Sequence, residues 1–348
     1  MPVFYYEAII LETIDPFSGK SFTVAALTAA INHLPNAYGN SRPLFSNIKR
    51  ERVRTIMIEE RNGVLTLINS QEPGGEPQQA DKTKRKLRSF VIPHFPLEDV
   101  ILPSAYSGIR GFGTTALMAR AQLVADRLQN LKASHDITHE YLRMGAKKGL
   151  ILDADGSVLY NLFTEFGITK QTVYFDLSNA NSNVPQTCRQ LKRLMEESLR
   201  GEVMRGVTVE VSPEFMDKLI SHKSVKEIWA GWQRSEEKIG GDPRERFPLG
   251  GLVFKESNAK HYPLTGQPIR FVSEGKGHAY PEGTMSSFFT AVAPADFNET
   301  VNTLGQEYYA KIEARKMGRG YDLHSQSNVL PMCARPGVLI EVDMGPKP

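Results

Sequence analysis

The sequence predicts an α+β protein built around one long helix, with strand-rich segments before and after it. Two observations favour this class. An apolar stripe at helical spacing covers about thirty residues in the first half of the chain, and several short runs of β-branched and aromatic residues are bounded by glycine or proline. The 348 residues are 41% hydrophobic and 23% charged, which is enough apolar material for one large core or two smaller ones.

Residues 1–50 predict an N-terminal arm. One short helical pattern runs from Thr23 to Leu34 and should end at Pro35, and the remainder predicts irregular chain. Such a segment has few side chains with which to form a core of its own. We therefore expect it to lie on something else and to gain its order from adjoining copies of the chain.

From Val53 the pattern predicts a β-ribbon. Strand-like residues flank Asn62-Gly63, a dipeptide typical of tight hairpin turns, and a polar tip rich in Pro and Gly follows. A basic run then leads into a third strand-like run, SFVIPHF, at 89–95. An isolated ribbon of this kind is marginal in water, so we expect a neighbouring subunit to cover it.

The clearest helix is predicted from Thr115 to Met144, with Thr114 or Thr115 as N-cap and Gly145 just beyond its end. Its apolar stripe alternates steps of four and three residues: Leu117, Ala121, Val124, Leu128, Leu131, His135, Thr138 and Leu142. Thirty residues at about 1.5 Å each span about 45 Å. Such a helix can serve as a spine against which strands pack.

The second half of the chain alternates between the two element types. Residues 148–168 predict two strands joined at Asp155-Gly156, with the second continuing as an alternating strand through VLYNLFTEF. A helix is expected from about Pro185 to Leu199, and from Gly283 onward most patterns are strand-like.

Charge and cysteine content exclude several classes of protein. Lys and Arg total 42 against 39 Asp and Glu, which lacks the basic excess of a protein dominated by phosphate contacts. Cys188 and Cys333 are far apart and have no metal-ligand spacing, so neither a disulfide framework nor a zinc site is indicated. We expect no membrane span and no export signal, and a reducing cytoplasm fits this composition.

One motif has the form of a phosphatase nucleophile. Asp153-Ala154-Asp155-Gly156-Ser157 follows an apolar run, as in haloacid-dehalogenase-type phosphatases that use magnesium. That chemistry needs a late acidic pair, whereas the aspartates beyond residue 200 are scattered singly. A hairpin turn is the favoured interpretation, with a magnesium-dependent phosphatase as the alternative. A calcium loop fits poorly, because Thr164 stands where a bidentate Glu is required.

Two further patterns are weaker. His135-Asp136-Ile137-Thr138-His139 resembles the HExxH zinc motif, but Asp replaces Glu and no third ligand is evident, so a polar helix face or a subunit contact is favoured. Gly19-Lys20-Ser21 lacks the first glycine of a phosphate-binding loop. A cluster of basic residues in the extended loop could touch nucleic acid, although a solvated edge or an acidic patch on a neighbour is favoured: Lys82, Lys84, Arg85, Lys86 and Arg88.

Five blocks together resemble one family, the lambda-like major capsid proteins of tailed phages, known as the capsid protein E family. The blocks lie in the family's order and span most of the chain: FVIPHFPLEDVI (90–101), KGLILDADGSVLYNLFTEFGI (148–168), SPEFMDKLISHKSVKE (212–227), PADFNETVNTLG (294–305) and SQSNVLPMCARPGVLIEV (325–342).

The resemblance implies the Hong Kong 97-type capsid fold. We map an N-terminal arm to 1–50 and an extended loop to 51–92. A peripheral domain with the spine helix 115–144 maps to 93–170, an axial domain to 171–290, and a return to the peripheral domain to 291–348.

The resemblance also implies the function. It predicts self-assembly into hexamers and pentamers of an icosahedral shell around double-stranded DNA, with portal, scaffold and decoration proteins as further partners. The protein would belong to the virion and assemble in the host cytoplasm. No catalytic, cofactor-binding or metal-binding residue is implied, and no cofactor is expected.

Overall fold

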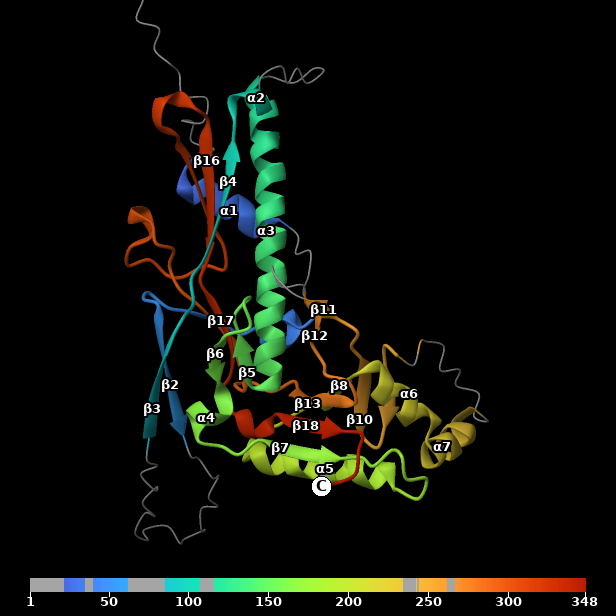
Figure 1. The fold of residues 1–348 in the computed structure, drawn as a ribbon. Helices are drawn as coiled ribbons and strands as arrows, with labels where there is room; N and C mark the ends of the chain where they lie inside the picture. The colour runs from blue at the N-terminus through green and yellow to red at the C-terminus, as the bar shows by residue number, and fades with distance from the viewer. Residues whose placement is uncertain are drawn as a thin grey trace, which may run out of the picture.

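The computed structural model describes residues 22–34, 40–61, 85–106, 116–233, 242, 244–261 and 267–348. Figure 1 shows two limbs that meet near the lower end of one long helix. A tall limb of strands stands beside that helix, and a broader limb extends sideways beneath it. In the described part of the chain, none of the helices combines the length and the hydropathy that crossing a bilayer requires.

Helix α3 (Ala116–Lys148) is the axis of the tall limb. Its 33 residues make it about 50 Å long, so the predicted spine helix is confirmed. The N-cap predicted at Thr114 or Thr115 lies outside the described residues. The prediction that Gly145 lies beyond the helix is wrong. A Cβ at Gly145 would meet the carbonyl oxygen of Leu150 at 2.8 Å, so glycine is required inside the last turn for the next strand to pack closely. Gly149, with φ of +77°, ends the helix instead.

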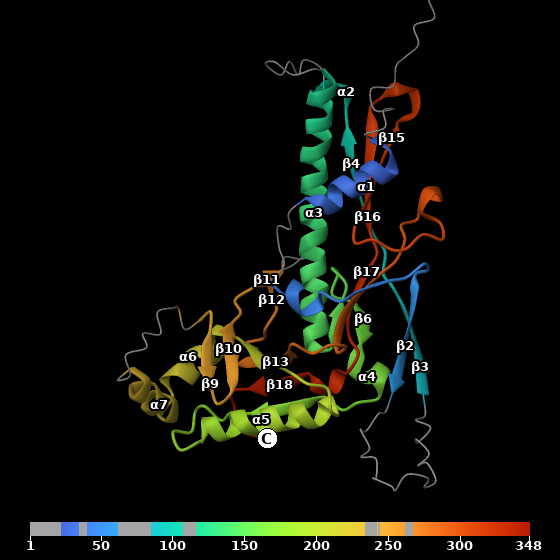
Figure 2. The ribbon, with the colours of Figure 1, turned by 180° about the vertical axis from the view of Figure 1, so that it is seen from behind.

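A three-stranded antiparallel sheet lies beside the upper part of α3. Its order is β15-β16-β4, with β4 (Phe95–Ile101), β15 (Tyr309–Ala314) and β16 (Tyr321–Ser327). Helix α1 (Val24–His33) crosses this sheet and α3 (Figure 2). Apolar side chains from all of these elements form one buried cluster: Phe22, Leu27, Ile31, Ile101, Val124, Leu128, Leu131, Tyr308, Ala310, Tyr321 and Leu323.

The N-terminal segment packs on its own chain. The helix predicted at 23–34 is confirmed as α1, and Thr23 Oγ1 caps it by accepting a hydrogen bond from Ala26 N at 3.3 Å. Ile31 is 0% exposed and Phe45 is 2% exposed. The expectation that this segment has little to bury, and gains its order only from neighbouring copies, is therefore wrong for its described parts.

A second three-stranded sheet combines one strand from the N-terminal segment with two strands from the C-terminal part of the sequence. Its order is β1-β14-β17, with β1 (Ile48–Arg50), β14 (Phe288–Val292) and β17 (Val329–Cys333). β1 runs parallel to β14, and every residue of β14 and β17 is buried. The 3-10 turn Arg42–Phe45 precedes β1, and Thr290 Oγ1 donates to the Phe45 carbonyl oxygen at 3.0 Å. The arm is therefore continuous with the core.

The broad limb is built on a six-stranded sheet of order β7-β18-β13-β8-β10-β9. Its strands are β7 (Gln171–Tyr174), β8 (Gly206–Val211), β9 (Phe247–Leu249), β10 (Leu252–Glu256), β13 (Lys276–Glu282) and β18 (Ile340–Asp343). Its helices are α5 (Val184–Leu199), α6 (Pro213–Ser221) and α7 (Lys223–Gln233). In Figure 1, α5 runs beneath the sheet, and α6 and α7 lie at its far end.

Helix α5 confirms the helix predicted at 185–199, with Asn183 as its cap. β18 belongs to the six-stranded sheet although it comes from the segment mapped to 291–348. The sheet therefore draws residues from both of the segments 171–290 and 291–348, and the division of the chain into domains stays a prediction.

A two-stranded ribbon extends from the tall limb on the side away from the six-stranded sheet (Figure 2). It pairs β2 (Thr55–Arg61) with β3 (Arg85–Val91) in antiparallel register. The strand predicted at 89–95 is thus divided between β3 and β4. The Asn62-Gly63 turn and the rest of 62–84 lie outside the described residues.

Small elements complete the described chain. They are helix α2 (Pro103–Tyr106), the hairpin β5 (Leu150–Leu152) and β6 (Val158–Asn161), helix α4 (Leu162–Phe166), and the pair β11 (Lys260–His261) and β12 (Ile269–Arg270).

Candidate functional site

Two histidines of α3 face two serines of β16 inside the tall limb. His135 Nε2 lies 2.9 Å from Ser325 Oγ, and His139 Nε2 lies 2.7 Å from Ser327 Oγ. All four residues are buried, with at most 3% exposed. Four helix residues rise about 6 Å and two strand residues about 6.8 Å, so the two spacings match. This histidine–serine ladder fixes the position of β16 along the helix.

Burial keeps both imidazoles neutral. Desolvation, with a smaller effect of His324, lowers the pKa of His135 to about 4. Desolvation also lowers the pKa of His139 well below its ordinary value, and the Arg143 guanidinium acts in the same direction. A neutral imidazole has one donor and one acceptor nitrogen, which suits a hydroxyl partner.

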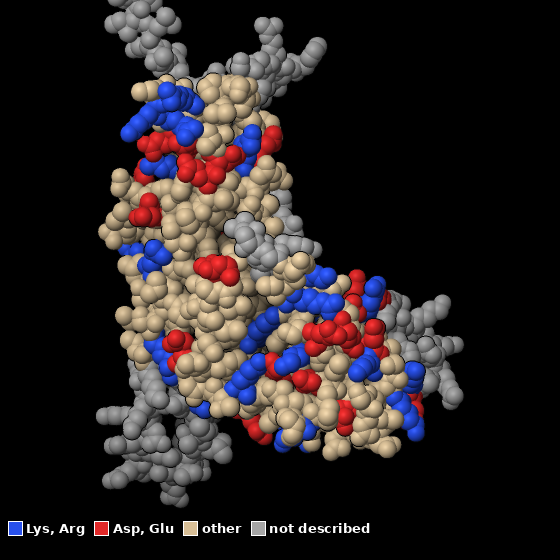
Figure 3. Space-filling view, in the orientation of Figure 1, with Lys and Arg blue, Asp and Glu red and all other residues tan. Residues whose placement is uncertain are grey.

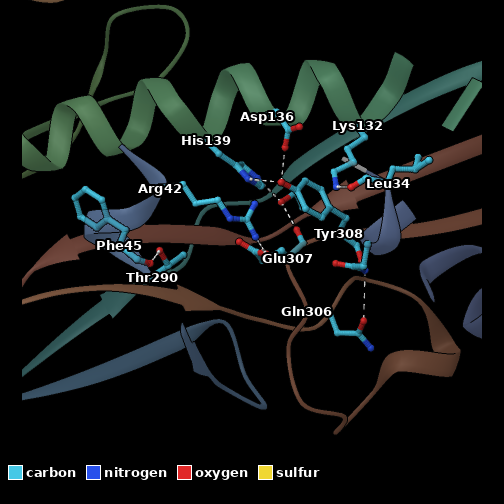
Figure 4. A network of polar contacts seen from close by, with 12 residues as sticks. Leu34, Arg42, Phe45, Lys132, Asp136, His139, Thr290, Gln306, Glu307 and Tyr308 are labelled. Atoms are coloured by element: carbon cyan, nitrogen blue, oxygen red, sulfur yellow. Dashed lines mark hydrogen bonds and ion pairs between the residues drawn. The ribbon is translucent and has the colours of Figure 1, made fainter. Parts of the chain in front are cut away.

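Tyr308 closes this polar layer next to the ladder (Figure 4). Its hydroxyl donates to Asp136 Oδ1 at 2.5 Å and lies 3.2 Å from His139 Nδ1. Burial and the Asp136 carboxylate raise the pKa of Tyr308, so it remains a donor. Lys132 Nζ lies 4.8 Å from the Tyr308 ring centroid and donates to the Leu34 carbonyl oxygen at 2.5 Å. The spine helix thereby holds the end of α1.

Ion pairs extend the layer toward residue 42. Arg42 Nη2 lies 2.7 Å from Glu307 Oε2, and Arg143 Nη2 lies 3.9 Å from Glu307 Oε1. The backbone N–H of Ser41 donates to Glu140 Oε1 at 2.9 Å. These contacts attach the arm to the helix at a few polar points, which are costly to break because they are partly buried.

The geometry does not support a zinc hydrolase at His135-Asp136-Ile137-Thr138-His139. Within the ranges that the structure describes, no three His, Cys, Asp or Glu side chains are placed to hold a metal ion. The favoured prediction of a polar helix face or subunit contact is wrong as well. The two histidines and Asp136 are buried inside their own chain, because β16 presents hydroxyls at the matching spacing.

The Asp153–Ser157 segment forms the turn of the β5–β6 hairpin, so the turn prediction is confirmed. Gly156 N donates to the Asp153 carbonyl oxygen at 2.9 Å, and Ser157 N donates to Asp155 Oδ1 at 2.8 Å. The predicted continuation of the strand through residue 166 is wrong. Asn161 Oδ1 accepts hydrogen bonds from the first N–H groups of α4 and starts a helix there.

The residues of the predicted basic cluster at 82–88 differ in their surroundings. Lys82, Lys84 and the Gly19-Lys20-Ser21 segment lie outside the described residues, and Arg85 and Lys86 belong to β3. Arg88 donates to the carbonyl oxygens of Glu165 and Phe166, and its guanidinium lies 5.0 Å from the Phe166 ring centroid. Arg88 therefore fastens the ribbon to α4, and the prediction of a solvated edge or a neighbour's acidic patch is wrong for this residue.

The two cysteines are buried and free. Burial raises the pKa of both Cys188 and Cys333 to about 12, so both thiols stay protonated and unreactive.

The ribbon has one buried and one exposed apolar face. Ile56, Ile58 and Phe90 are at most 5% exposed and belong to the main core. On the opposite face, Met57 and Leu87 are each 64% exposed and Val91 is 54% exposed. We call Met57, Leu87 and Val91 the outer ribbon face. A strand pair that leaves such side chains in water is typical of a contact surface.

Comparison with known proteins decides between the functions considered so far. The model of the family described as "Phage major capsid protein E" matches residues 23–344. The chain belongs to this family. It is therefore a shell-forming phage capsid protein, and the phosphatase alternative is not supported.

Two curated relatives of this capsid protein are named major capsid protein. That of Salmonella phage Felix O1 is 28% identical, over 92% of this chain and 96% of the relative. That of Pseudomonas phage KPP10 is 27% identical, over 94% of this chain and 98% of the relative.

Solved structures establish the fold. A putative capsid protein of a prophage of E. coli CFT073 gives a TM-score of 0.58 at 14% identity, over 92% of this chain and 99% of that chain. A phage-related protein from Bordetella bronchiseptica RB50 gives 0.50 at 11% identity, over 94% and 99% of the two chains. The predicted α+β fold of the Hong Kong 97 type is confirmed.

Sequence patterns missed the partners of the polar layer. Tyr308, Ser325 and Ser327 were not singled out, although the two serines stand at strand spacing in SQSN and could have been matched to the two histidines. Glu307 carried no local signal, because its partners are more than a hundred residues away along the chain.

Proposed function

We propose that this capsid protein assembles into hexamers and pentamers that close an icosahedral shell around double-stranded phage DNA, and that the outer ribbon face is one of its subunit contacts. The ribbon carries the proposal. Its inner face is used within the chain, and its outer face presents Met57, Leu87 and Val91 to solvent. Covering such a strand pair with a neighbouring subunit removes apolar surface from water and gives the ribbon the support that two strands lack.

The charge distribution supports contacts along the tall limb. On the face shown in Figure 3, the middle of this limb carries few Lys, Arg, Asp or Glu side chains, whereas more of them lie toward its ends. Depletion of charge is typical of the centre of a protein interface. Such contacts between identical chains are heterologous, so rotation closes a ring.

Other partners follow from the role in the shell. We propose a portal protein, a scaffold and decoration proteins as further partners, assembly in the host cytoplasm, and only non-specific proximity to packaged DNA, because the net charge of +3 provides no large basic excess. The chain is proposed to act without catalytic, cofactor or metal residues.

Negative-stain microscopy of the purified chain tests the proposal. The expected result is shells or rings of capsomer size. Met57→Glu with Leu87→Glu should abolish them, because two carboxylates would be buried at the contact, while far-UV circular dichroism stays unchanged. Val158→Glu, an equally exposed residue at the β5–β6 hairpin, is the matched control and should assemble. A wild-type chain that stays monomeric would refute the proposal.

A second variant tests the alternative of a magnesium-dependent phosphatase. Asp153→Asn changes only a turn carboxylate, so shells should form at the wild-type yield. Magnesium-dependent release of phosphate that this substitution abolishes, from a chain that forms no shells, would contradict the proposed function.

A further inference from the structure

Helix α5 carries a basic face at the edge of the molecule. Figures 1 and 2 show α5 on the side of the six-stranded sheet that points away from α3. Its apolar side chains belong to the main core: Val184, Cys188, Leu191, Met195 and Leu199. Cations and amides alternate with them on the N-terminal half of the helix and are exposed or half-buried: Gln186, Arg189, Gln190, Lys192 and Arg193. We call Arg189, Lys192 and Arg193 the basic face of α5.

The basic face has no counter-charge of its own. No Asp or Glu occurs in the sequence between Asp176 and Glu196. Within the part of the chain that the structure describes, the side chains of Arg189, Lys192 and Arg193 make no hydrogen bond or ion pair. Arg189 and Arg193 stand four positions apart, a spacing at which like charges on a helix repel each other. An anion from outside the chain would relieve this repulsion.

The composition of the face fits phosphate better than it fits another protein. None of the large apolar side chains that the described chain exposes lies on α5, whereas the centre of a protein interface is apolar and depleted of charge. Guanidinium, ammonium and amide groups are donors that bind phosphate oxygens in complexes with nucleic acid. The positive end of the helix dipole lies at the same half of α5 and favours the same ligand.

We propose that the basic face of α5 binds the phosphate backbone of the packaged double-stranded DNA. The contact rests on the proposed function and adds to it a defined place where the shell touches its contents. Arg189 and Arg193 are about 6 Å apart along the helix axis. The phosphates of one DNA strand follow each other at about 3.4 Å along the duplex, so the two guanidinium groups can bind neighbouring phosphates. Contacts of this kind carry no sequence information.

The contact is local and weak in a single copy. Three cations neutralise few phosphates, and the net charge of +3 for the whole chain adds no broad basic surface around them. Many copies in one shell present the same face to the same DNA, so the binding gains strength by multivalency. Its dependence on salt identifies it, because each neutralised phosphate releases counterions.

Fluorescence anisotropy with a labelled duplex DNA of mixed sequence tests the contact. The protein is the unassembled full chain, separated from shells by gel filtration. The basic-face variant is Arg189→Gln with Lys192→Gln and Arg193→Gln. At low salt it should bind the duplex about tenfold or more weakly than wild type, because three charged contacts are lost. The slope of log Kd against log salt should fall by about 2 to 3, at about 0.9 for each contact.

Two further variants serve as controls. Arg52→Gln with Lys316→Gln and Arg319→Gln removes the same residue types from exposed sites elsewhere on the chain. It should bind the duplex within about twofold of wild type. Arg189→Lys with Arg193→Lys keeps the charges and should also bind within about twofold, because the contact depends on charge. Far-UV circular dichroism verifies that every variant is folded.

The outcomes separate this contact from the proposed function. A wild-type chain that does not bind the duplex at low salt, a basic-face variant with the wild-type slope, or a control that weakens as much would overturn the contact. A basic-face variant that keeps its DNA binding but forms no shells would show that the face meets another copy of the chain, which also refutes the contact with DNA. Absence of shells from the wild-type chain would overturn the proposed function, and the DNA titration does not depend on assembly.

Discussion

The histidine–serine ladder should make the folded chain sensitive to mild acid. An unfolded histidine titrates near pH 6.5, whereas burial lowers the pKa of His135 to about 4 and that of His139 well below its ordinary value. Above about pH 6.5 both states are neutral, and the stability of the ladder is fully present. As the pH falls below this value the unfolded chain binds protons first, so the folded state loses stability until the folded pKa is reached.

The size of the effect follows from linkage. Each pH unit in this window costs up to about 1.4 kcal/mol per buried histidine. Between pH 7.5 and pH 5 His135 alone should lose about 2 kcal/mol of unfolding free energy, and His139 adds a loss in the same direction. The Glu202 carboxylate affects the unfolding free energy in a different pH range. Burial raises its pKa, but hydrogen bonds from Ser286 and Ser287 and the charge of Arg335 outweigh burial and lower it, so its contribution is lost only below about pH 4.5.

The assay is guanidinium unfolding of the purified chain, followed by far-UV circular dichroism at pH 7.5 and pH 5. The comparison is between wild type and His135→Gln with His139→Gln. His278, whose pKa burial and Lys148 lower to about 3, adds to the acid loss of both proteins and cancels in the difference. Wild type should lose at least about 2 kcal/mol more than the variant, the amount expected from His135 alone. His33→Gln, at an exposed site on α1, should behave as wild type. Equal losses in wild type and the double variant would refute the reasoning.

Three substitutions test other parts of the fold by the same unfolding assay at pH 7.5. Tyr308→Phe removes a hydrogen bond to a buried carboxylate and should cost about 2 kcal/mol, and an unchanged midpoint would contradict the layer described here. Gly156→Ala should cost about 1 kcal/mol, because φ is +85° there but the space around the new Cβ is open. Gly149→Ala should cost more, because φ is also positive and the new Cβ would lie 2.4 Å from the Phe163 ring. Lys147→Met breaks a buried ion pair, in which Lys147 Nζ lies 2.6 Å from Glu210 Oε1, and should lower the unfolding free energy by about 3 kcal/mol. The loss should be smaller in the double variant with Glu210→Gln, which leaves no unpaired charge.

Features with a local cause were predictable from the sequence. The spine helix was found because an apolar stripe repeats over many turns, and the Asp153–Ser157 turn because Asp-Gly tolerates positive φ. Helix α1 was likewise predicted from a short helical pattern between Thr23 and Leu34. Each of these depends on residues within a few positions of one another, so pattern and propensity were sufficient.

Features that join distant segments were missed. Gly145 matched the signal for a helix end, yet a close approach of Leu150 uses the same lack of a side chain inside the helix. The arm carried too few apolar residues to form a core, but Ile31 and Phe45 insert into cores that other segments complete. The outer ribbon face and the polar layer likewise depend on strands that pair only in the fold, and Ser325 lies 190 residues from His135.

The polar layer stands between two separate apolar cores along the spine helix. Leu131 belongs to the core of the upper tall limb and Leu142 to the main core below, with His135 and His139 between them. Apolar contacts alone specify the position of a strand along a helix weakly, because neighbouring registers bury similar area. Matched hydrogen bonds at His135 and His139 do not survive a shift, since buried donors and acceptors would lose their partners. A slip of one helical turn would displace β16, and with it the loop at residues 315–320, by about 5 Å relative to the six-stranded sheet. The ladder therefore fixes where the upper end of the tall limb stands relative to the ribbon, so every copy of this shell-forming chain presents the same shape to its neighbours.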